Sequence, residues 1–382
     1  MGKTFWRPRD ASGVYKASVS QESFSLARGI PSPDLLPVAG LRAAADRALK
    51  HPADVLLYGD AAGLEPLRAW FAERTGAPVD RVILTNGSLH GLGMLGAILH
   101  PERDWIAVEA PTYDFGLETV RRTGCRIVAL DRDAELLDLD ALEHEIAQAG
   151  PPRLAYVLPT FQNPSGGTLA SATRARLVEL AREHDFPVVE DDPYRDIAFR
   201  GPVPPAMRDA APGQVVLMTS LSKTVAPGMR VGALVIPERH VAAVRDLASH
   251  TYVAPGRFSH GVAFAFCDSP DYAAHLGSVV NTLGARARGL TDALNEALET
   301  SYQAPDGGYF LWISAPGGDA GRAAARAAEH GVVVQPGTSF FPDDRGNRFL
   351  RLSFAGIAAD AMPTIASRLR RAWAPLLAGR TR

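Results

Sequence analysis

The sequence predicts an α/β protein with a three-layer α/β/α large domain, whose sheet is mostly parallel and seven-stranded, and a smaller α+β domain. Three observations lead to this fold class. Seven short apolar, β-branched runs recur between residues 82 and 236, and apolar residues at helical spacing fill several of the gaps between them. The runs are apolar throughout, which is typical of parallel strands that helices cover on both faces.

The large domain accounts for the first part of this pattern. Its expected strands, in chain order, are RVILT, WIAVEA, CRIVAL, LAYVLPT, FPVVED, VVLMTS and GALVIP. Helices are expected at residues 89–99 and 171–184, where apolar residues recur with helical spacing. Strands that alternate with helices in this way predict a sheet built from parallel crossover units.

The smaller domain is predicted from residue 238 onward, where the helices become longer. One helix is expected near residues 270–300 and a last one near 358–376, with the strand-like runs YFLWIS, VVVQP and FLRLSF between them. Pro and Gly punctuate the N-terminal region, which is expected to form an arm laid over other structure. The predicted divisions are an arm at 1–40 that packs with the small domain, a large domain at 41–270 and a small domain at 271–382.

The composition indicates small-molecule chemistry. The 382 residues are 46% hydrophobic and 21% charged, and 40 basic against 42 acidic residues leave a net charge of −2, which gives no field to attract nucleic acid or an anionic membrane. Cys125 and Cys267 are too few for a disulfide framework or a zinc knuckle, so no metal site is expected. No run reaches the roughly 18 apolar residues of a membrane span, and a reduced, cytoplasmic protein is expected.

Polar residues gather where the predicted strands end. Ligands of open α/β sheets bind beyond the carboxyl ends of the strands. Five runs end there in Asn86-Gly87-Ser88, Pro111-Thr112-Tyr113, Gln162-Asn163-Pro164, Asp191-Asp192 and Ser220-Leu221-Ser222-Lys223. The sequence therefore predicts a ligand site at this edge of the sheet.

A lysine, a carboxylate and an arginine near this edge match the needs of pyridoxal 5'-phosphate (PLP). This cofactor requires a lysine amine for a Schiff base, a carboxylate that keeps its ring nitrogen protonated, anion donors for its phosphate and a flat group against its ring. Lys223 would supply the amine, and Arg230 would bind phosphate and lower the lysine pKa. Asp191 would be the partner of the ring nitrogen.

The phosphate of PLP has its own expected donors. Gly87 and Ser88 open a helix directly after a strand, where free backbone N–H groups and the helix dipole favour an anion. The hydroxyls of Ser220 and Ser222 would add further donors. Together with Arg230, these residues predict a phosphate-binding cup.

With these motifs in place, the chain resembles the class I/II aminotransferases of fold type I, and among them the 2-aminoadipate/kynurenine aminotransferase branch. The resemblance covers nearly the whole chain. It rests on LARGIPSPDLLP, Tyr58-Gly59 followed by GLEPLR, TNGS, EAPTY, PTFQNPSGGTL, VVEDDPY, SLSKTVAPGMRVG and LRLSF. It implies a PLP-dependent aminotransferase of amino-acid metabolism that moves the amino group of an L-amino acid to a 2-oxo acid with ping-pong kinetics.

The resemblance also implies roles for further residues. Asn163, which also faces the substrate, would bond the phenolic oxygen of the ring together with Tyr194, and Tyr113 would stack on the ring. Arg351 would clamp the α-carboxylate of the substrate, a task that suits bidentate recognition by arginine. The implied catalytic residues are Lys223, Asp191 and Tyr194.

A homodimer with its sites at the subunit interface is implied as well. By the resemblance, Tyr58 would reach the phosphate in the neighbouring subunit's site, and Gly29 would lie beside the substrate. Members of the family commonly carry an amide after the serine of the phosphate cup, whereas this chain has Leu89 and His90. Leu89 would therefore contribute only its backbone N–H.

Two other classes of protein fit parts of the sequence less well. The stretch from Gly91 to Gly96 spells a dinucleotide-binding pattern with Glu109 at a later strand end, but its register places the glycines inside a helix. Some transcription regulators carry an aminotransferase-like domain that senses PLP or amino acids. They need a DNA-binding domain ahead of it, and no basic recognition helix precedes the aminotransferase-like pattern here.

One alternative stays open from the sequence. A PLP enzyme of the same fold could carry out β- or γ-elimination, replacement or carbon–carbon bond formation, because fold and cofactor do not choose the reaction. The identity of the amino acid and the roles of Arg28, His90 and His260 also stay open.

Overall fold

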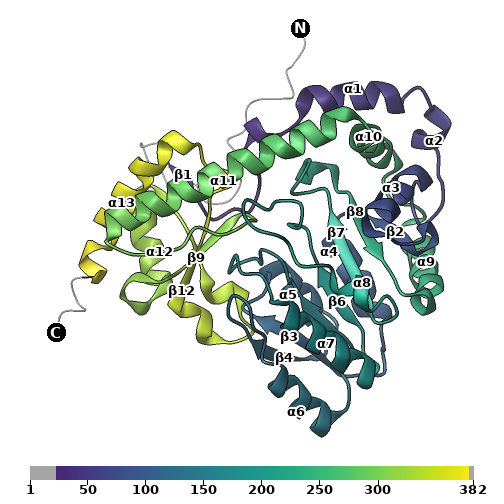
Figure 1. Cartoon of the computed structure of the whole chain (residues 1–382), viewed down its shortest axis with the longest axis horizontal. Coiled ribbons are helices and arrows are strands. Elements are labelled where there is room, and N and C mark those ends of the chain that lie inside the picture. The colour runs from purple at the N-terminus through teal and green to yellow at the C-terminus, as the bar shows by residue number, and fades with distance from the viewer. Residues whose placement is uncertain (1–22, 378–382) are drawn as a thin grey trace.

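A seven-stranded sheet forms the centre of the larger lobe of the computed structural model, which describes residues 23–377 (Figure 1). In spatial order its strands are β2 (Val82–Thr85), β8 (Gly232–Val235), β7 (Val215–Ser220), β6 (Val188–Asp191), β5 (Ala155–Val157), β3 (Trp105–Ala110) and β4 (Arg126–Asp131). β8 runs antiparallel to both of its neighbours, and the remaining pairs are parallel. All seven predicted runs thus form one mostly parallel sheet.

Helices cover both faces of this sheet and confirm the three layers. One face carries α4 (Ser88–Ile98), α5 (Asp114–Arg121) and α9 (Glu238–Tyr252). The other face carries α6 (Leu139–Ala149) and α7 (Ser171–Glu183), and near β2 and β8 it carries α3 (Glu65–Thr75) and α10 (Arg257–Cys267). Two further helices pack on α10, namely α1 (Val38–Ala48) and α2 (Pro52–Leu56), and the short α8 (Met207–Ala210) precedes β7.

The dinucleotide-like glycine pattern lies inside α4, where the register predicts it. A Cβ atom at Gly91 would approach Leu234 Cδ2 of β8 to 2.8 Å, and one at Gly96 would approach Thr123 Cγ2 to 2.9 Å. These glycines allow close packing of α4 on its neighbours and do not form a turn at a strand end.

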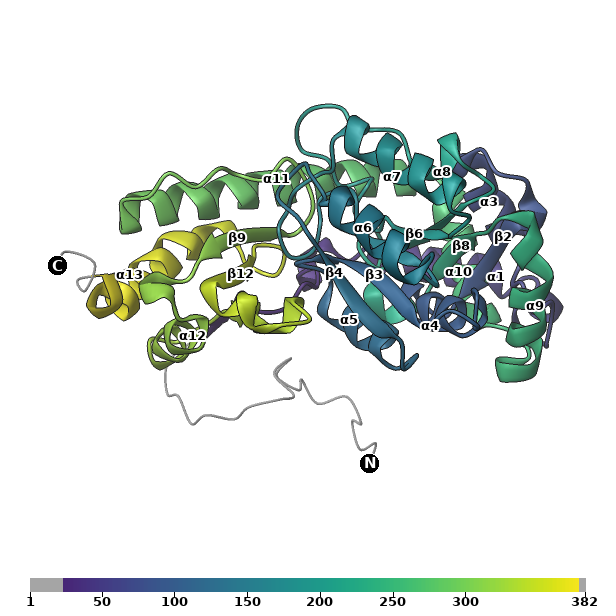
Figure 2. The same ribbon diagram turned by 90° about the horizontal axis from the view of Figure 1, so that it is seen from below.

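The smaller lobe contains an antiparallel sheet with the order β11 (Gln335–Pro336), β12 (Phe349–Ser353) and β9 (Phe310–Ser314). Its apolar core is completed by α11 (Pro270–Leu298), α12 (Ala320–Glu329) and α13 (Met362–Leu377). The long helix α11 runs from α10 in the larger lobe to α13 in the smaller one (Figures 1 and 2).

The described part of the N-terminal region contributes to the smaller lobe. Its strand β1 (Phe24–Ser25) pairs in parallel with β10 (Val332–Val333), and Leu26 and Leu35 lie in the core of that lobe. Residues 1–22 of the predicted arm lie outside the described residues, and the divisions at residues 40 and 270 stay predictions. Within residues 23–377, no helix combines the length and the apolar character that a membrane crossing requires.

Candidate active site

Lys223 lies just beyond the carboxyl end of β7, under the N-terminal arm. Its Nζ donates a hydrogen bond to the backbone oxygen of Gly29 at 2.7 Å, and it lies 5.7 Å and 5.4 Å from the ring centres of Tyr194 and Tyr309. Burial, followed by the positive charge of Arg351, lowers the pKa of the Lys223 amine to about 8. An amine with this pKa can accept and return protons near neutral pH.

Asp191 ends β6 and is 3% exposed. Its Oδ2 accepts a hydrogen bond from the hydroxyl of Tyr156 at 2.7 Å, while its Oδ1 has no partner among the described residues. Burial raises the pKa of Asp191 to about 7, although the bond from Tyr156 lowers it. A buried carboxylate oxygen without a partner is costly unless a ligand supplies a donor.

The start of α4 forms a cup for an anion at the same edge of the sheet. Gly87, with φ of 85°, directly precedes the helix, and Arg230 Nη2 donates to the backbone oxygen of Asn86 at 3.1 Å. Gly232 closes the cup from β8, because a Cβ atom there would approach the backbone of Gly87 to 2.6 Å. Free N–H groups at a helix start beside a guanidinium group suit a phosphate.

Two buried hydroxyls lie near this cup. Ser220 ends β7 and Ser222 follows it, and the backbone N–H of Ser222 donates to Ser220 Oγ at 3.4 Å. Ser88 and Leu89, in the first turn of α4, are half-buried. The structure thus brings the predicted phosphate donors to the amino end of α4 and the carboxyl end of β7.

Arg351, on β12 of the smaller lobe, reaches across to the large sheet. Its Nη1 donates to Asn163 Oδ1 at 2.8 Å and its Nη2 to the backbone oxygen of Ala27 at 2.5 Å. The guanidinium group lies 4.4 Å and 4.7 Å from the ring centres of Phe310 and Phe340, and its Nε has no partner among the described residues. The two aromatic rings hold the arginine in a fixed plane.

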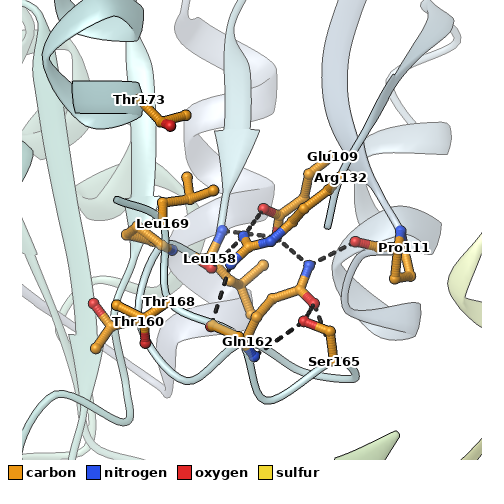
Figure 3. A network of polar contacts seen from close by, with 12 residues as sticks. Glu109, Pro111, Arg132, Leu158, Thr160, Gln162, Ser165, Thr168, Leu169 and Thr173 are labelled. Carbon is orange, nitrogen blue, oxygen red and sulfur yellow. Dashed lines mark hydrogen bonds and ion pairs between the residues drawn. The ribbon is translucent and has the colours of Figure 1, made fainter. Parts of the chain in front are cut away.

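A buried polar network supports the loop that carries Asn163 (Figure 3). Glu109 is completely buried and pairs with Arg132, and it accepts hydrogen bonds from Leu158 N at 2.9 Å and Gln162 Nε2 at 2.8 Å. Gln162 in turn accepts from the hydroxyl and the backbone N–H of Ser165. Glu109 therefore has a structural role here and does not stand where a nucleotide ribose would bind.

Tyr113 and Tyr194 come from two different segments of the larger lobe, one after β3 and one after β6. Tyr113 precedes α5 and is half-buried, while Tyr194 is 2% exposed and packs against Tyr309 at a ring distance of 5.5 Å. Burial raises the pKa of both Tyr113 and Tyr194 above the ordinary tyrosine value, so both hydroxyls remain protonated near neutral pH.

Three residues near the site were not predicted from the sequence. Tyr156 lies within an apolar strand, Tyr309 precedes β9 and donates to the backbone oxygen of Lys223 at 2.7 Å, and Asp114 opens α5. Asp114 follows the predicted Tyr113 directly, and this adjacency at a strand end is the one sequence signal that could have found it.

Four other residues considered from the sequence lie apart from this group or at its rim. Tyr58 is 88% exposed, and Arg28 is exposed on the arm. His90 accepts a hydrogen bond from Asn86 N at 3.3 Å and packs on the ring of Tyr252. His260 is completely buried in α10, and burial lowers its pKa to about 4.

The chain matches the family model of aminotransferase class I and II over residues 24–369. It belongs to this family. A curated relative, the 2-aminoadipate transaminase of Thermus thermophilus, is 33% identical over 366 residues, which cover 93% of this chain and 91% of the relative. Among the described residues of this aminotransferase family member, no cluster of His, Cys, Asp and Glu side chains could hold a metal ion.

Solved aminotransferase structures share the whole fold of this family member. The α-aminoadipate aminotransferase LysN of Thermus thermophilus, complexed with N-(5'-phosphopyridoxyl)-L-leucine, superimposes with a TM-score of 0.87 at 31% identity and covers 93% of each chain. The kynurenine aminotransferase of Pyrococcus horikoshii, in complex with PMP, superimposes with a TM-score of 0.85 at 28% identity, over 94% of this chain and 92% of that one.

Transcription regulators also match this aminotransferase chain. The regulator TauR of Rhodobacter capsulatus is 31% identical over 299 residues, which are 76% of this chain and 60% of the regulator. The relatives of this chain therefore include both aminotransferases and proteins named as regulators, and the function of this family member has to be argued from its site.

Proposed function

We propose that this family member is a PLP-dependent aminotransferase, which transfers the amino group of an L-amino acid to a 2-oxo acid with ping-pong kinetics. The proposal rests on three charged side chains that lie near one another, Lys223, Asp191 and Arg351. Asp191 and Arg351 both act electrostatically on the Lys223 amine. A base, an anionic partner for the cofactor ring and a carboxylate clamp are the parts that amino-group transfer requires.

The residues at this edge of the sheet fit PLP. The Oδ1 atom of Asp191, buried and without a partner among the described residues, suits a protonated ring nitrogen. When bound, the cofactor withdraws electrons from the substrate α-carbon and so acidifies its hydrogen. The residues that would hold the cofactor are Gly87, Ser88, Leu89, Tyr113, Asn163, Asp191, Tyr194, Ser220, Ser222, Lys223 and Arg230, with Tyr58 from a second subunit.

The protein's own groups would divide the remaining work. Lys223 would hold the cofactor through its amine, and it would act as the base that accepts the proton from the substrate α-carbon. Arg351 would bind the α-carboxylate and so fix which hydrogen faces Lys223. The hydroxyl of Tyr194, which burial keeps protonated, would donate to the phenolic oxygen of the ring together with the amide of Asn163.

A homodimer is part of the proposal. Leu56, Leu57 and Tyr58 follow one another on the surface and are 59%, 64% and 88% exposed. A contiguous patch of exposed apolar side chains is typical of an interaction surface. A second copy of the chain would cover them and receive Tyr58 at its phosphate cup, and we place the enzyme in cytoplasmic amino-acid metabolism.

The decisive experiment follows one half-reaction. Purified protein with PLP is mixed with a panel of L-amino acids in the absence of a 2-oxo acid acceptor, and products are analysed by mass spectrometry. Conversion of PLP to pyridoxamine phosphate with one equivalent of 2-oxo acid supports transamination. Released ammonia or an altered substrate side chain, without pyridoxamine phosphate, would instead show elimination, replacement or bond-forming chemistry. Cofactor binding without any change of an amino acid would favour a sensing role.

A further inference from the structure

Asp114 is a charged side chain near the candidate site that the proposed mechanism does not use. It is the first residue of α5, directly after Tyr113, and it is half-buried. Its Oδ1 accepts a hydrogen bond from the backbone N–H of Phe115 at 3.0 Å. Within residues 23–377, neither carboxylate oxygen of Asp114 has an ion-pair partner. A half-buried carboxylate with no cation in direct contact is open to a charged group of a ligand.

The backbone fixes Asp114 close to the groups that would bind an amino acid. Thr112 N donates to the backbone oxygen of Phe340 at 2.8 Å, and the ring of Phe340 lies 4.7 Å from the Arg351 guanidinium group. The positive charges of Arg351 and Lys223 both act on Asp114, and Asp114 is the carboxylate with the largest electrostatic effect on Arg351. Because Asp114 follows Thr112 by two residues, it begins α5 on the side of the site where Arg351 lies.

When an amino acid is bound, the Asp114 carboxylate would interact with its side chain. Its α-carboxylate would neutralise Arg351, and its amino group would take the place of the Lys223 amine on the cofactor. Of the charges around this space, the negative charge of Asp114 would then lose Arg351, the cation that acts on it most strongly. An uncompensated carboxylate attracts a cationic group and repels a second carboxylate, most strongly where burial reduces screening by water.

We propose that Asp114 determines donor specificity by selecting amino acids whose side chain ends in an amine or a guanidinium group and by rejecting those that end in a carboxylate. This inference rests on the proposed aminotransferase function. It separates this chain from its relative that is named for 2-aminoadipate, an amino acid whose side chain ends in a carboxylate.

Binding of matched, unreactive ligands tests the proposal directly. 2-Methylornithine, 2-methylnorvaline and 2-methylglutamate all have a chain of five carbon atoms. Their side chains end in a cation, a methyl group and a carboxylate, respectively. They lack an α-hydrogen, so their dissociation constants can be read from the change in cofactor absorbance without turnover. The wild-type holoenzyme should bind the cationic ligand at least about tenfold more tightly than the acidic one.

The Asp114→Asn variant keeps the oxygen that accepts from Phe115 N and removes only the charge. It should bring the ratio of the two dissociation constants close to one, while the neutral ligand binds nearly as before. Glu118→Gln is the matched control, because Glu118 lies one turn further along α5 and points to solvent, with 54% of its side chain exposed. This control should keep the wild-type ratio.

Three results would overturn the inference about Asp114. One is tighter binding of the acidic ligand by the wild-type protein, which is expected if the positive charge of Arg28 sets the specificity for the side chain. The second is an unchanged ratio in Asp114→Asn, and the third is an equal weakening of all three ligands, which indicates a structural role. Failure of the proposed function looks different, because then neither L-ornithine nor L-norvaline would convert PLP to pyridoxamine phosphate.

Discussion

The hydroxyl of Tyr156 donates a hydrogen bond to Asp191 Oδ2 at 2.7 Å, and the two side chains are 0% and 3% exposed. The bond joins neighbouring parallel strands, since Tyr156 lies on β5 and Asp191 ends β6. It lowers the pKa of a carboxyl group that burial raises to about 7. Tyr156 thus helps to keep Asp191 ionised, which is the form that a protonated cofactor ring nitrogen would bind.

We expect cofactor binding to depend on pH through Asp191. Ionised Asp191 becomes scarcer as the pH falls through about 7, so the dissociation constant for PLP should rise below that pH. Tyr156→Phe removes a bond that favours the ionised form, which should shift this dependence to higher pH and weaken PLP binding at pH 7 by about tenfold. Fluorescence titration of the cofactor-free protein at a series of pH values measures both effects.

A second tyrosine provides the control for this prediction. Tyr252 is on α9, and its hydroxyl contacts only Met94 Sδ at 3.8 Å among the described residues, so Tyr252→Phe should leave the pH dependence of PLP binding in place. An unchanged profile in Tyr156→Phe would mean that Asp191 does not bind the cofactor ring or that Tyr156 does not tune it.

Lys223→Ala should abolish amino-group transfer and prevent covalent attachment of PLP. Borohydride reduction of the wild-type holoenzyme should fix the cofactor on the peptide that contains Lys223, and peptide mapping identifies it. Lys50, the only other lysine in residues 23–377, is exposed, so Lys50→Ala should retain both activity and labelling. Labelling of Lys50, or activity in Lys223→Ala, would refute the assignment.

The sequence predicted the edge of the sheet well because most of its strands are buried apolar runs with a sharp polar end. Lys223, Asp191 and Asn163 follow such ends, and parallel strands bring their carboxyl ends to one edge whatever their spatial order. The direction of β8 was not predictable, because an apolar run looks the same in both orientations.

The supporting residues of the site were harder to predict for a physical reason. Tyr156 lies inside an apolar run, and only the pairing of β5 with β6 decides that its hydroxyl meets Asp191. Tyr309 contacts Lys223, and Phe340 contacts Arg351. Both contacts depend on how the smaller lobe packs. Contacts between distant segments depend on register and packing, which a single sequence does not contain.

Arg351→Lys should raise KM for the amino donor by at least about tenfold, with a smaller effect on kcat. Lysine keeps the charge but loses the planar fork, which now holds Asn163 and Ala27 and would bind the α-carboxylate at two points. Steady-state kinetics with a single donor measure the change. Arg370, exposed on α13, provides the control Arg370→Lys, and an unchanged KM in Arg351→Lys would argue against a substrate clamp.

Glu109→Gln should destabilise the protein by about 3 kcal/mol, because it leaves the guanidinium group of Arg132 buried without a counter-ion. The loop with Gln162 and Asn163 should loosen as well, since Gln162 donates to Glu109 at 2.8 Å. A lower Tm by calorimetry reports the first effect, and a weaker affinity for PLP reports the second.

Two further variants decide whether the buried charge of Arg132 is the cause of this loss. Glu102→Gln changes an exposed carboxylate and should leave Tm nearly unchanged, because surface ion pairs contribute little. Adding Arg132→Met to Glu109→Gln removes the unpaired charge and should restore part of the lost stability. If the double variant is less stable than Glu109→Gln alone, the hydrogen bonds of Arg132 to Leu158 and Gly167 matter more than its charge.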